Sequence, residues 1–160
     1  MKLLRYRQKP DKPARWGWLS DEKIGNLEGS PFDTYRRKDP RLRLENVQLL
    51  PPAEPSKIVC IGRNYAAHAA EHGAEVPELP LIFLKPPSAL IAHGKTIFLP
   101  PQSRQVEHEA ELAVVIGERA RRVTPESASS HILGYTIAND VTARDLQYSD
   151  GQWTRGKGFD

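Results

Sequence analysis

The sequence predicts a mixed fold that is mainly β-structure, with a few short helices and a small β-rich module at its N-terminus. Short apolar runs rich in branched residues recur along the chain, bounded by Gly, Pro or charged residues, as is typical of strands. Two segments carry signals for the start of a helix. A proline-rich segment, residues 51–55, divides the chain into a short part and a long part.

The short part, residues 1–55, is expected to be a module of short strands that ends in the linker Pro51-Pro52-Ala53-Glu54-Pro55. Trp16 and Trp18 flank one residue of a predicted strand, so they share one face of it. We expect them to pack against the main domain or a partner subunit. The predicted strands cover residues 16–19, 23–27 and 47–50.

The long part, residues 56–160, is expected to form the main domain and to consist mostly of strands. Thr124-Pro125-Glu126 combines a cap, a proline at the first helical position and an early acid, which predicts a helix to about Ser130. Asp140 is expected to cap a second helix that runs through Gln147. The predicted strands cover residues 57–61, 81–85, 96–99, 112–116 and 133–138.

The formal net charge of +3 is distributed unevenly along the chain. Residues 1–56 hold 12 Lys and Arg against 8 Asp and Glu, whereas residues 57–160 hold 11 against 12. The basic tract at residues 35–38 is flanked by Asp33 and Asp39, and the nearby aromatic residues are not spaced for stacking on bases. We therefore interpret the tract as a solvated loop and expect no nucleic-acid partner. A modestly basic surface also attracts a small anionic substrate.

The sequence also favours a particular compartment. No apolar run approaches the roughly 20 residues of a membrane helix, and charge follows the first five residues where a signal peptide would be apolar. Cys60 is the single cysteine, and its place in a predicted strand suits a small apolar role rather than catalysis. We expect a cytoplasmic protein with no membrane partner.

Three acidic side chains at predicted strand ends are the strongest candidates for chemistry: Glu109, Glu111 and Asp140. Residues 112–116 read as a buried strand, and alternation along it places Glu109 and Glu111 on one face, with Glu107 if the strand starts that early. Like charges there repel, and a bound cation would relieve the repulsion. Oxygen ligands without a nearby Cys favour Mg²⁺, Mn²⁺ or Ca²⁺ over zinc. The alternative is a solvated edge strand with a helix-capping Asp.

Five short motifs occur in an order and at a spacing that resemble the fumarylacetoacetate hydrolase family, in particular its acylpyruvase and 2-hydroxyhepta-2,4-diene-1,7-dioate isomerase branch. The resemblance covers residues 57–160. It implies a rolled β-sheet core for a catalytic domain, and one divalent cation, Mg²⁺ or else Mn²⁺ or Ca²⁺, bound by the three acidic residues. The motifs are Gly62-Arg63-Asn64-Tyr65 through Glu71, Phe83-Leu84-Lys85-Pro86, His108-Glu109-Ala110-Glu111-Leu112, Gly134-Tyr135 through Gln147, and Lys157-Gly158-Phe159-Asp160.

His68 and Glu71 are the candidate pair for proton transfer. They share one face if residues 65–71 form a helical turn, and a carboxylate beside an imidazole suits a general base. Two unrelated surface residues are the alternative, and the resemblance favours the catalytic pair.

The resemblance also implies roles for residues that contact the substrate. Lys157 is the expected electrophile, because a lysine can hold the oxyanion that forms; the alternative is a surface lysine in a glycine-rich loop. Helical spacing would place Arg144 and Gln147 on one face with Asp140. The expected substrate contacts are Arg144, Gln147, Lys85 and Tyr65; the alternative for Arg144 is a structural ion-pair partner.

By resemblance, the expected reaction is metal-dependent hydrolysis of a carbon–carbon bond in an acylpyruvate-type 1,3-dicarbonyl or 2-oxo acid. Isomerisation or decarboxylation of 2-oxo or 2-hydroxydienoic diacids is the alternative, because these reactions share an enolate. The resemblance implies a homodimer, and it implies that a complete member continues past Asp160 with strands that complete the sheet. The alternative of another class is therefore a catalytically silent fragment that acts as a binding or dimerisation module.

Overall fold

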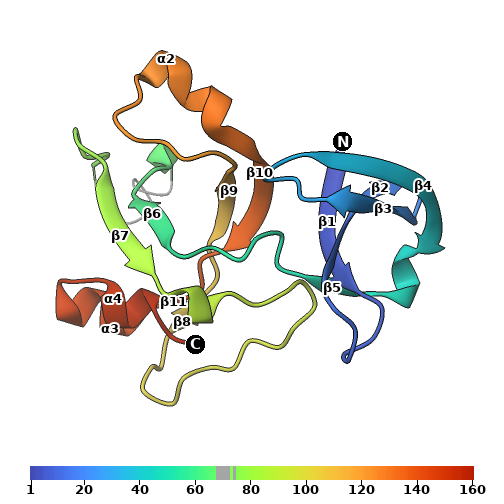
Figure 1. Cartoon of the computed structure of the whole chain (residues 1–160). Helices are drawn as coiled ribbons and strands as arrows, with labels where there is room; N and C mark the ends of the chain where they lie inside the picture. The colour runs from blue at the N-terminus through green and yellow to red at the C-terminus, as the bar shows by residue number, and fades with distance from the viewer. Residues whose placement is uncertain (68–72, 74) are drawn as a thin grey trace. The chain divides into compact units, whose positions relative to one another are not determined.

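The structure is a computed structural model that describes residues 1–67, 73 and 75–160 (Figure 1). It is mainly β-structure with a few short helices, as predicted. The chain forms two compact units. The first comprises Met1–Glu54, Ile91–Lys95 and Ala110–Ala138, and the second comprises Pro55–Leu90, Thr96–Glu109 and Asn139–Asp160. One boundary lies in the proline-rich linker, and the assignment of residues 1–55 and 56–160 as two domains stays a prediction.

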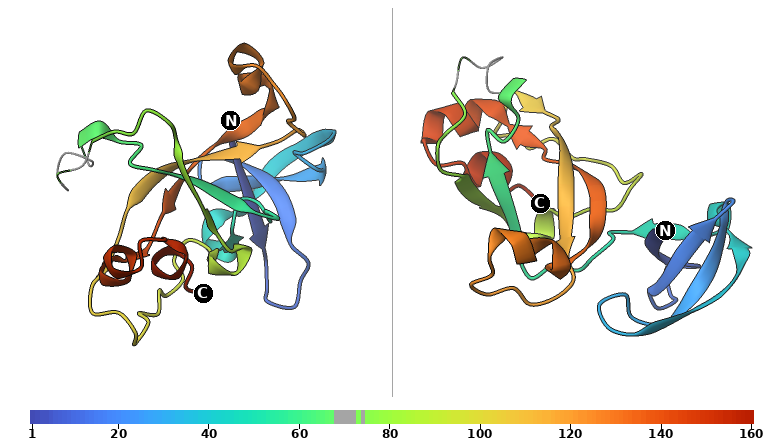
Figure 2. Two further views of the ribbon diagram at one scale, coloured as in Figure 1. Left: turned by 90° about the vertical axis from the view of Figure 1, so that its left-hand side faces the viewer. Right: turned by 90° about the horizontal axis from the view of Figure 1, so that it is seen from above.

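An antiparallel sheet of five strands forms from the first fifty residues, in the order β4-β3-β2-β1-β5. Figure 2 shows these strands side by side. A single turn of 3-10 helix, η1 (Leu44–Asn46), connects the last two strands. The strands are β1 (Lys2–Arg7), β2 (Arg15–Ser20), β3 (Lys23–Gly29), β4 (Tyr35–Arg43) and β5 (Gln48–Leu50).

The interpretation of the basic tract at residues 35–38 as a loop is wrong, because these residues begin β4. Tyr35, Arg36 and Arg37 pair with Gly29, Glu28 and Leu27 of β3, while their side chains stay exposed. A strand without alternating apolar residues carries no pattern by which the sequence could reveal it.

The interior of this sheet is small and closely packed around Tyr6, Ile24 and Leu27. Two glycines allow the strands to pack this closely: a Cβ at Gly17 would lie 2.5 Å from the Ile24 side chain, and one at Gly25 would lie 2.3 Å from the indole nitrogen of Trp18.

Both tryptophans of β2 contact residues of the N-terminal module itself. Trp16 packs edge-to-face on Phe32, and the Trp18 indole donates a hydrogen bond to the carbonyl oxygen of Lys38 at 3.0 Å.

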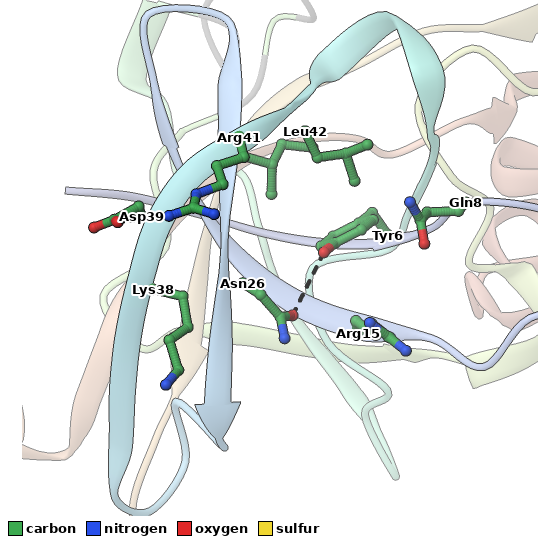
Figure 3. Close-up of a pocket in the computed structure, with 9 residues that line it drawn as sticks. Tyr6, Gln8, Arg15, Asn26, Lys38, Asp39, Arg41 and Leu42 are labelled. Carbon is green, nitrogen blue, oxygen red and sulfur yellow. Dashed lines mark hydrogen bonds and ion pairs between the residues drawn. The ribbon is translucent and has the colours of Figure 1, made fainter.

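A hollow of about 410 Å³ lies on the same sheet (Figure 3). Tyr6 and Asn26 meet in it, with the tyrosine hydroxyl donating to Asn26 Oδ1 at 3.4 Å. Burial raises the pKa of the Tyr6 phenol, and the positive charge of Arg15 opposes that rise only in part. Two basic residues of the lining are exposed and already paired with carboxylates, Lys38 with Glu28 and Arg41 with Asp39. The hollow therefore offers no concentrated charge for a ligand.

The first unit also contains a two-stranded ribbon of β9 (Ala110–Ile116) and β10 (Ile132–Asn139). Between these strands lie α2 (Pro125–Ala128) and the 3-10 turn η3 (Ser129–His131), so the prediction of a short helix from Pro125 is confirmed. The prediction of a buried strand at residues 112–116 is half wrong. The strand exists, but every second side chain, including Leu112, is exposed.

The second unit contains a second ribbon, in which β6 (Ile58–Gly62) pairs antiparallel with β7 (Leu81–Lys85). Cys60 lies in β6 and is half-buried. A third, very short pair joins β8 (Val106–Glu107) to β11 (Thr142–Ala143). Among the residues that the structure describes, this unit contains the helical elements η2 (Pro87–Ala89), α3 (Arg144–Asp150) and α4 (Thr154–Lys157).

Two predictions about the second unit are wrong. Residues 96–99 form no strand; Phe98 and Leu99 lie exposed in an irregular segment. The helix expected to start at Asp140 starts at Arg144 instead, because residues 142–143 are extended and pair with β8. Within the described part of the chain, no helix has the length and apolar character that crossing a membrane requires.

Candidate active site

The candidate site is built at the ends of short strands in the second unit. Lys85 is the last residue of β7, and Glu107 is the last residue of β8. Glu109 directly precedes β9 in the sequence, and Asp140 directly follows β10. Strand ends suit a polar site, because the backbone there leaves the sheet and charged side chains need not enter its apolar face.

Lys157 occupies the centre of the site. Its ammonium group donates hydrogen bonds to Glu109 Oε2 at 2.6 Å and to Asp140 Oδ2 at 2.7 Å, and the residue is only 2% exposed. The aromatic ring of Phe83 lies 5.3 Å from the same ammonium group and packs edge-to-face on Trp153. A buried ammonium group held by two carboxylates is stable only as long as both partners remain ionised.

The alternative of a surface lysine in a glycine-rich loop is wrong, because Lys157 is buried and ends the short helix α4. A Cβ at Gly156 would lie 2.9 Å from the backbone nitrogen of Gln147. Glycine is therefore needed at position 156 so that α4 can approach α3 closely, and this approach fixes the backbone that carries Lys157.

Both the side chain and the backbone of Asp140 are fixed by hydrogen bonds. Its second carboxylate oxygen accepts a hydrogen bond from the Lys85 ammonium group at 2.5 Å, and the same ammonium group also donates to the carbonyl oxygen of Val141 at 3.2 Å. The backbone N–H of Asp140 donates to the carbonyl oxygen of Glu109 at 2.9 Å. The prediction that Asp140 caps a helix is therefore wrong. Its carboxylate instead binds two lysines, Lys85 and Lys157, that are distant from each other in the sequence.

Arg144 organises the other acidic residues from the first turn of α3. Its guanidinium group donates to Glu107 Oε2 at 2.9 Å, to Glu109 Oε1 at 2.6 Å and to Gln147 Oε1 at 2.6 Å. Arg144 and Gln147 are both buried, and they lie three positions apart on one face of the helix. Arg144 thus positions Glu109, which in turn contacts Lys157.

The charges around Glu109 set its protonation state. Burial alone raises the pKa of its carboxyl group, but the hydrogen bonds and positive charges of Lys157 and Arg144 outweigh burial, so the pKa lies below its ordinary value. Burial likewise lowers the pKa of Arg144, and the hydrogen bonds and negative charges of Glu107 and Glu109 more than reverse that effect. Glu109 therefore remains a carboxylate near neutral pH, which makes it a charge-holding group rather than a proton donor.

The three predicted metal ligands are only partly brought together. Glu109 and Asp140 share one positive group, so two oxygen ligands converge as a hard cation would require. Glu111 lies in β9, half-buried, and the described residues contain no group of three His, Cys, Asp or Glu side chains arranged for a metal ion. The donor chemistry of Glu109 and Asp140 therefore fits a cation such as Mg²⁺, and Glu111 as the third ligand stays a prediction.

The prediction that Glu109 and Glu111 share one face of a continuous strand is wrong. Strand β9 begins at Ala110, after Glu109, and Glu107 belongs to the separate strand β8. Strand alternation therefore does not relate the two side chains, and Glu109 joins the site through Arg144 and Lys157 instead.

The structure adds little on three further candidate residues. His68 and Glu71, the expected pair for proton transfer, lie outside the described residues. Tyr65 is described and is exposed. The roles of these three residues remain predictions from the resemblance.

Sequence reasoning missed Asn139, Phe83 and Trp153. The side-chain oxygen of Asn139 accepts a hydrogen bond from the backbone N–H of Glu109 at 3.1 Å, which fixes the chain next to Asp140. Phe83 has the spacing of a residue on the same strand face as Lys85, so alternation could have identified it as part of the wall. No signal in the sequence pointed to Trp153, whose contact with Phe83 depends on the tertiary fold.

Comparison with known proteins identifies the class of protein. Residues 57–160 match the model of the fumarylacetoacetate hydrolase C-terminal domain, and residues 1–52 match the model named Rv2993c-like, N-terminal. The chain therefore belongs to the fumarylacetoacetate hydrolase family, and the fold class expected from the resemblance is confirmed.

Three known proteins of this kind are similar to this chain. The Mycobacterium tuberculosis protein Rv2993c is 50% identical over 130 residues, which are 81% of this chain and 49% of the relative. The bovine mitochondrial oxaloacetate tautomerase FAHD2A is 45% identical over 120 residues, 74% of this chain and 38% of the relative. The solved structure of 2-hydroxyhepta-2,4-diene-1,7-dioate isomerase from Mycobacterium marinum is 39% identical, with a TM-score of 0.85 that covers 100% of this chain and 62% of that one. The chain spans about half or less of the length of these two curated relatives.

Proposed function

We propose that this chain supplies part of an active site that stabilises the enolate of a dicarboxylic 2-oxo acid, and that the whole protein catalyses tautomerisation or isomerisation of that acid. The observation that carries the proposal is the buried Lys157 ammonium group beside Glu109 and Asp140. The names of two relatives, an oxaloacetate tautomerase and a hydroxyheptadienedioate isomerase, support this reaction class. The order of preference among the expected reactions therefore changes, with isomerisation ahead of carbon–carbon hydrolysis.

Lys157 is suited to hold negative charge on the oxygen of an enolate. An ammonium group in a site walled by Phe83 and Trp153 interacts with an oxyanion more strongly than it would in water. Its partners, Glu109 and Asp140, keep it fixed before substrate binds, so little reorganisation is needed. Lys85 brings a second ammonium group to Asp140, and it suits one carboxylate of a diacid.

The proton that moves in this reaction needs a group other than Glu109, because the pKa of Glu109 is lowered. We assign proton transfer to His68, oriented by Glu71, on the basis of the family resemblance. Arg144 and Gln147 are proposed to position Glu109, because the buried Arg144 guanidinium group donates to Glu109 Oε1 and is itself held by Gln147 Oε1.

A divalent cation is part of the proposal. Mg²⁺, or else Mn²⁺ or Ca²⁺, would be held by Glu109, Glu111 and Asp140, and when bound it would polarise the substrate oxygens as a Lewis acid. The convergence of Glu109 and Asp140 on one positive group, the Lys157 ammonium, supports binding of a cation by these two carboxylates.

A second candidate function is hydrolysis of a carbon–carbon bond in an acylpyruvate-type substrate. The family that matches residues 57–160 takes its name from a hydrolase, and hydrolytic cleavage releases the same kind of enolate. The two reactions are distinguished by offering enol-oxaloacetate and an acylpyruvate to the same preparation. Isomerisation removes the enol absorbance without cleavage, whereas hydrolysis releases pyruvate.

The test of the proposed function compares wild type with Lys157→Met in the whole protein, with Mg²⁺ or Mn²⁺ present. We expect kcat to fall by about 10²–10³-fold, as it does when an oxyanion donor is removed. Lys95→Met, at an exposed lysine, is the matched control and should retain full activity. Lys157→Arg keeps the positive charge, so its thermal unfolding separates loss of chemistry from loss of folding. Absence of activity on every 2-oxo diacid and 1,3-dicarbonyl tried would favour the silent binding module instead.

We also propose that the whole protein is a homodimer, as the resemblance implies. Sedimentation velocity across a hundredfold range of concentration tests this. A single sharp species with the mass of one chain throughout would contradict it.

A further inference from the structure

A group of hydrogen bonds next to the candidate site ties the start of α3 to the segment that precedes β8. Asp145 is the second residue of α3 and is half-buried. Its Oδ1 accepts a hydrogen bond from the Ser103 hydroxyl at 2.6 Å, and its Oδ2 accepts one from the backbone N–H of Arg104 at 2.9 Å. One carboxylate therefore fixes two successive residues that lie 42 and 41 positions earlier in the chain. We call these two contacts the Asp145 clamp.

A simpler role for Asp145 is to stabilise the helix to which it belongs. An acidic side chain in the first turn interacts favourably with the helix dipole. The backbone N–H of Leu146 also donates a hydrogen bond to Asp145 Oδ1 at 3.0 Å. That role requires no contact outside α3, whereas Ser103 and Arg104 belong to a separate segment. The carboxylate therefore also fixes one segment of the chain against another.

The hydrogen bonds of the clamp are made to an ionised group. The backbone N–H of Arg104 and the hydroxyl of Ser103 lower the pKa of the Asp145 carboxyl group by more than burial raises it. Asp145 is thus a carboxylate near neutral pH, and hydrogen bonds to an ionised acceptor are stronger than those between neutral groups. The Ser103 hydroxyl also accepts a hydrogen bond from the backbone N–H of Gln105 at 3.2 Å, which adds a local turn to the clamped segment.

The clamped segment leads directly into the candidate site. The backbone N–H of Arg144 donates a hydrogen bond to the carbonyl oxygen of Gln105 at 2.7 Å. The side-chain amide of Gln105 donates to Glu107 Oε1 at 2.5 Å, and the Arg144 guanidinium group donates to Oε2 of the same carboxylate at 2.9 Å. Because Arg144 immediately precedes Asp145, the clamp fixes both the backbone that carries the guanidinium group and the acid that orients it.

We propose that Asp145 is a positioning residue of the active site, which acts on the reaction through Arg144 and Glu109. Arg144 donates to Glu109 Oε1 at 2.6 Å, and Glu109 Oε2 accepts a hydrogen bond from the buried Lys157 ammonium group at 2.6 Å. A shift of α3 against residues 103–105 is therefore transmitted to Lys157 in two steps. The effect on the reaction rests on the proposed function, whereas the effect of Asp145 on Arg144 does not.

Loss of the clamp should affect the transition state more than the bound substrate. Lys157 is proposed to stabilise charge that develops during the reaction, and misplacing such a group lowers kcat rather than substrate affinity. With enol-oxaloacetate and Mg²⁺, Asp145→Ala in the whole protein should lower kcat by about tenfold or more, while KM changes by less than about twofold, since small displacements of a catalytic group cost up to about 10²-fold in rate.

The hydrogen bond from Arg144 Nε–H to Glu107 provides a readout that needs no turnover. A buried, hydrogen-bonded Nε–H exchanges slowly with water, so it gives an NMR signal in protein labelled with ¹⁵N-arginine. Arg144→Lys identifies that signal by removing it. Asp145→Ala should shift the signal and speed its exchange with water by about tenfold or more, because the guanidinium group is no longer fixed.

Graded variants and a matched control separate the clamp from a general loss of folding. Asp145→Asn keeps only one acceptor oxygen and should fall between wild type and Asp145→Ala in both readouts. Ser103→Ala removes one contact and should have little further effect in the Asp145→Ala background. Asp150→Ala, at the other end of α3, removes an ion pair with the exposed Arg155 and should leave kcat and the Arg144 signal unchanged. If Asp145→Ala does not fold, Asp145→Asn and Ser103→Ala carry the same test.

An Arg144 signal that is unchanged in all the folded variants of the clamp would overturn the inference, and so would a changed signal with the kcat of wild type. An equal loss of kcat in Asp150→Ala would also overturn it, because any change in α3 would then have the same effect. A wild-type protein that turns over neither enol-oxaloacetate nor an acylpyruvate would remove the proposed function. A signal that still depends on Asp145 in that case would leave the positioning of Arg144 in place.

Discussion

The five-stranded N-terminal sheet and the two ribbons use the same alternation of apolar and polar residues, yet they bury it to different extents. In the sheet, Ile24 is 2% exposed and packs with Tyr6 and Leu27. In the β9–β10 ribbon, Ile137 occupies an equally regular strand and stays open to solvent. The difference shows that alternation creates an apolar face, whereas the number of packed strands decides whether that face becomes a core.

The N-terminal sheet and the ribbons also differ in the charged groups that they carry. The charged groups that line the hollow of the sheet are exposed pairs such as Arg41 with Asp39. Each ribbon has only two strands, yet Lys85, Glu109 and Asp140, which form buried ion pairs, lie at or next to the ends of these strands. Ion pairs among these residues, rather than apolar packing on both faces, hold the site in the described part of the chain.

The largest expected difference between the two regions comes from removing a buried apolar side chain. Ile24→Ala should lower the free energy of unfolding by about 2–5 kcal/mol, because it leaves a cavity among residues that cannot collapse around it. The matched change Ile137→Ala should lower it by less than about 1 kcal/mol. Urea titration followed by tryptophan fluorescence measures both values, and equal losses would mean that the Ile137 side chain is covered in solution.

Glycine substitutions test the same difference in packing between the N-terminal sheet and the β9–β10 ribbon. Gly25→Ala places a methyl group 2.3 Å from the Trp18 indole nitrogen, and we expect a loss of about 1–3 kcal/mol. Gly134→Ala in β10 meets nothing within 4 Å and should be neutral or slightly stabilising. Thermal unfolding of the two variants provides the measurement, and a tolerated alanine at position 25 would contradict the packing described for the sheet.

The site should make stability depend on pH in the acid range. The pKa of Glu109 in the folded chain is lowered from its ordinary value of 4.5, so its contribution is fully present above that value and is lost as the pH falls through the lowered pKa. Denaturation measured at a series of pH values below about 5 should show this loss. Glu109→Gln should flatten the profile in that window, and an unchanged profile would show that Lys157 and Arg144 do not hold the carboxylate.

The smallest expected effect comes from a polar residue on an open face. Ile137→Thr should change the free energy of unfolding by no more than about 0.5 kcal/mol, because the side chain is already in water. The same change should reduce binding of a dye that is specific for exposed apolar surface. Val115→Thr, on the other face of β9, is the matched variant and should leave dye binding almost unchanged. Equal dye binding by wild type and Ile137→Thr would count against the exposure of the Ile137 side chain on β10.

Local patterns in the sequence predicted the elements that have strong local causes. The strands β6, β7, β9 and β10 coincide with branched apolar runs, and α2 begins at the proline that follows Thr124. The strand β4 was missed because Arg36, Arg37 and Lys38 are held by pairing with β3 and not by any apolar period of their own. The helix α3 was placed too early because the pairing of β11 with β8 keeps the preceding residues extended.

The candidate site was predictable in its residue types but not in its contacts. The sequence and the family resemblance predict Glu109, Asp140, Lys157, Lys85 and Arg144 as residues of the site. Their arrangement depends on pairs that are far apart in the sequence: Lys85 and Asp140 are 55 positions apart, and Lys157 and Glu109 are 48 apart. No local rule relates such residues, so the two carboxylates that share Lys157, and the use of Arg144 to hold Glu109, are visible only in the fold.

Calorimetric titration with oxalate, whose planar dianion mimics the enolate of pyruvate, tests the central claim most directly. The titration compares wild type with Lys157→Met and Lys95→Met in the presence of Mg²⁺. If Lys157 holds the enolate oxygen, Lys157→Met should bind oxalate at least about tenfold more weakly than wild type, whereas Lys95→Met should bind it equally well. Equal affinity for oxalate in wild type and Lys157→Met would contradict the assignment of Lys157 as the group that stabilises the enolate.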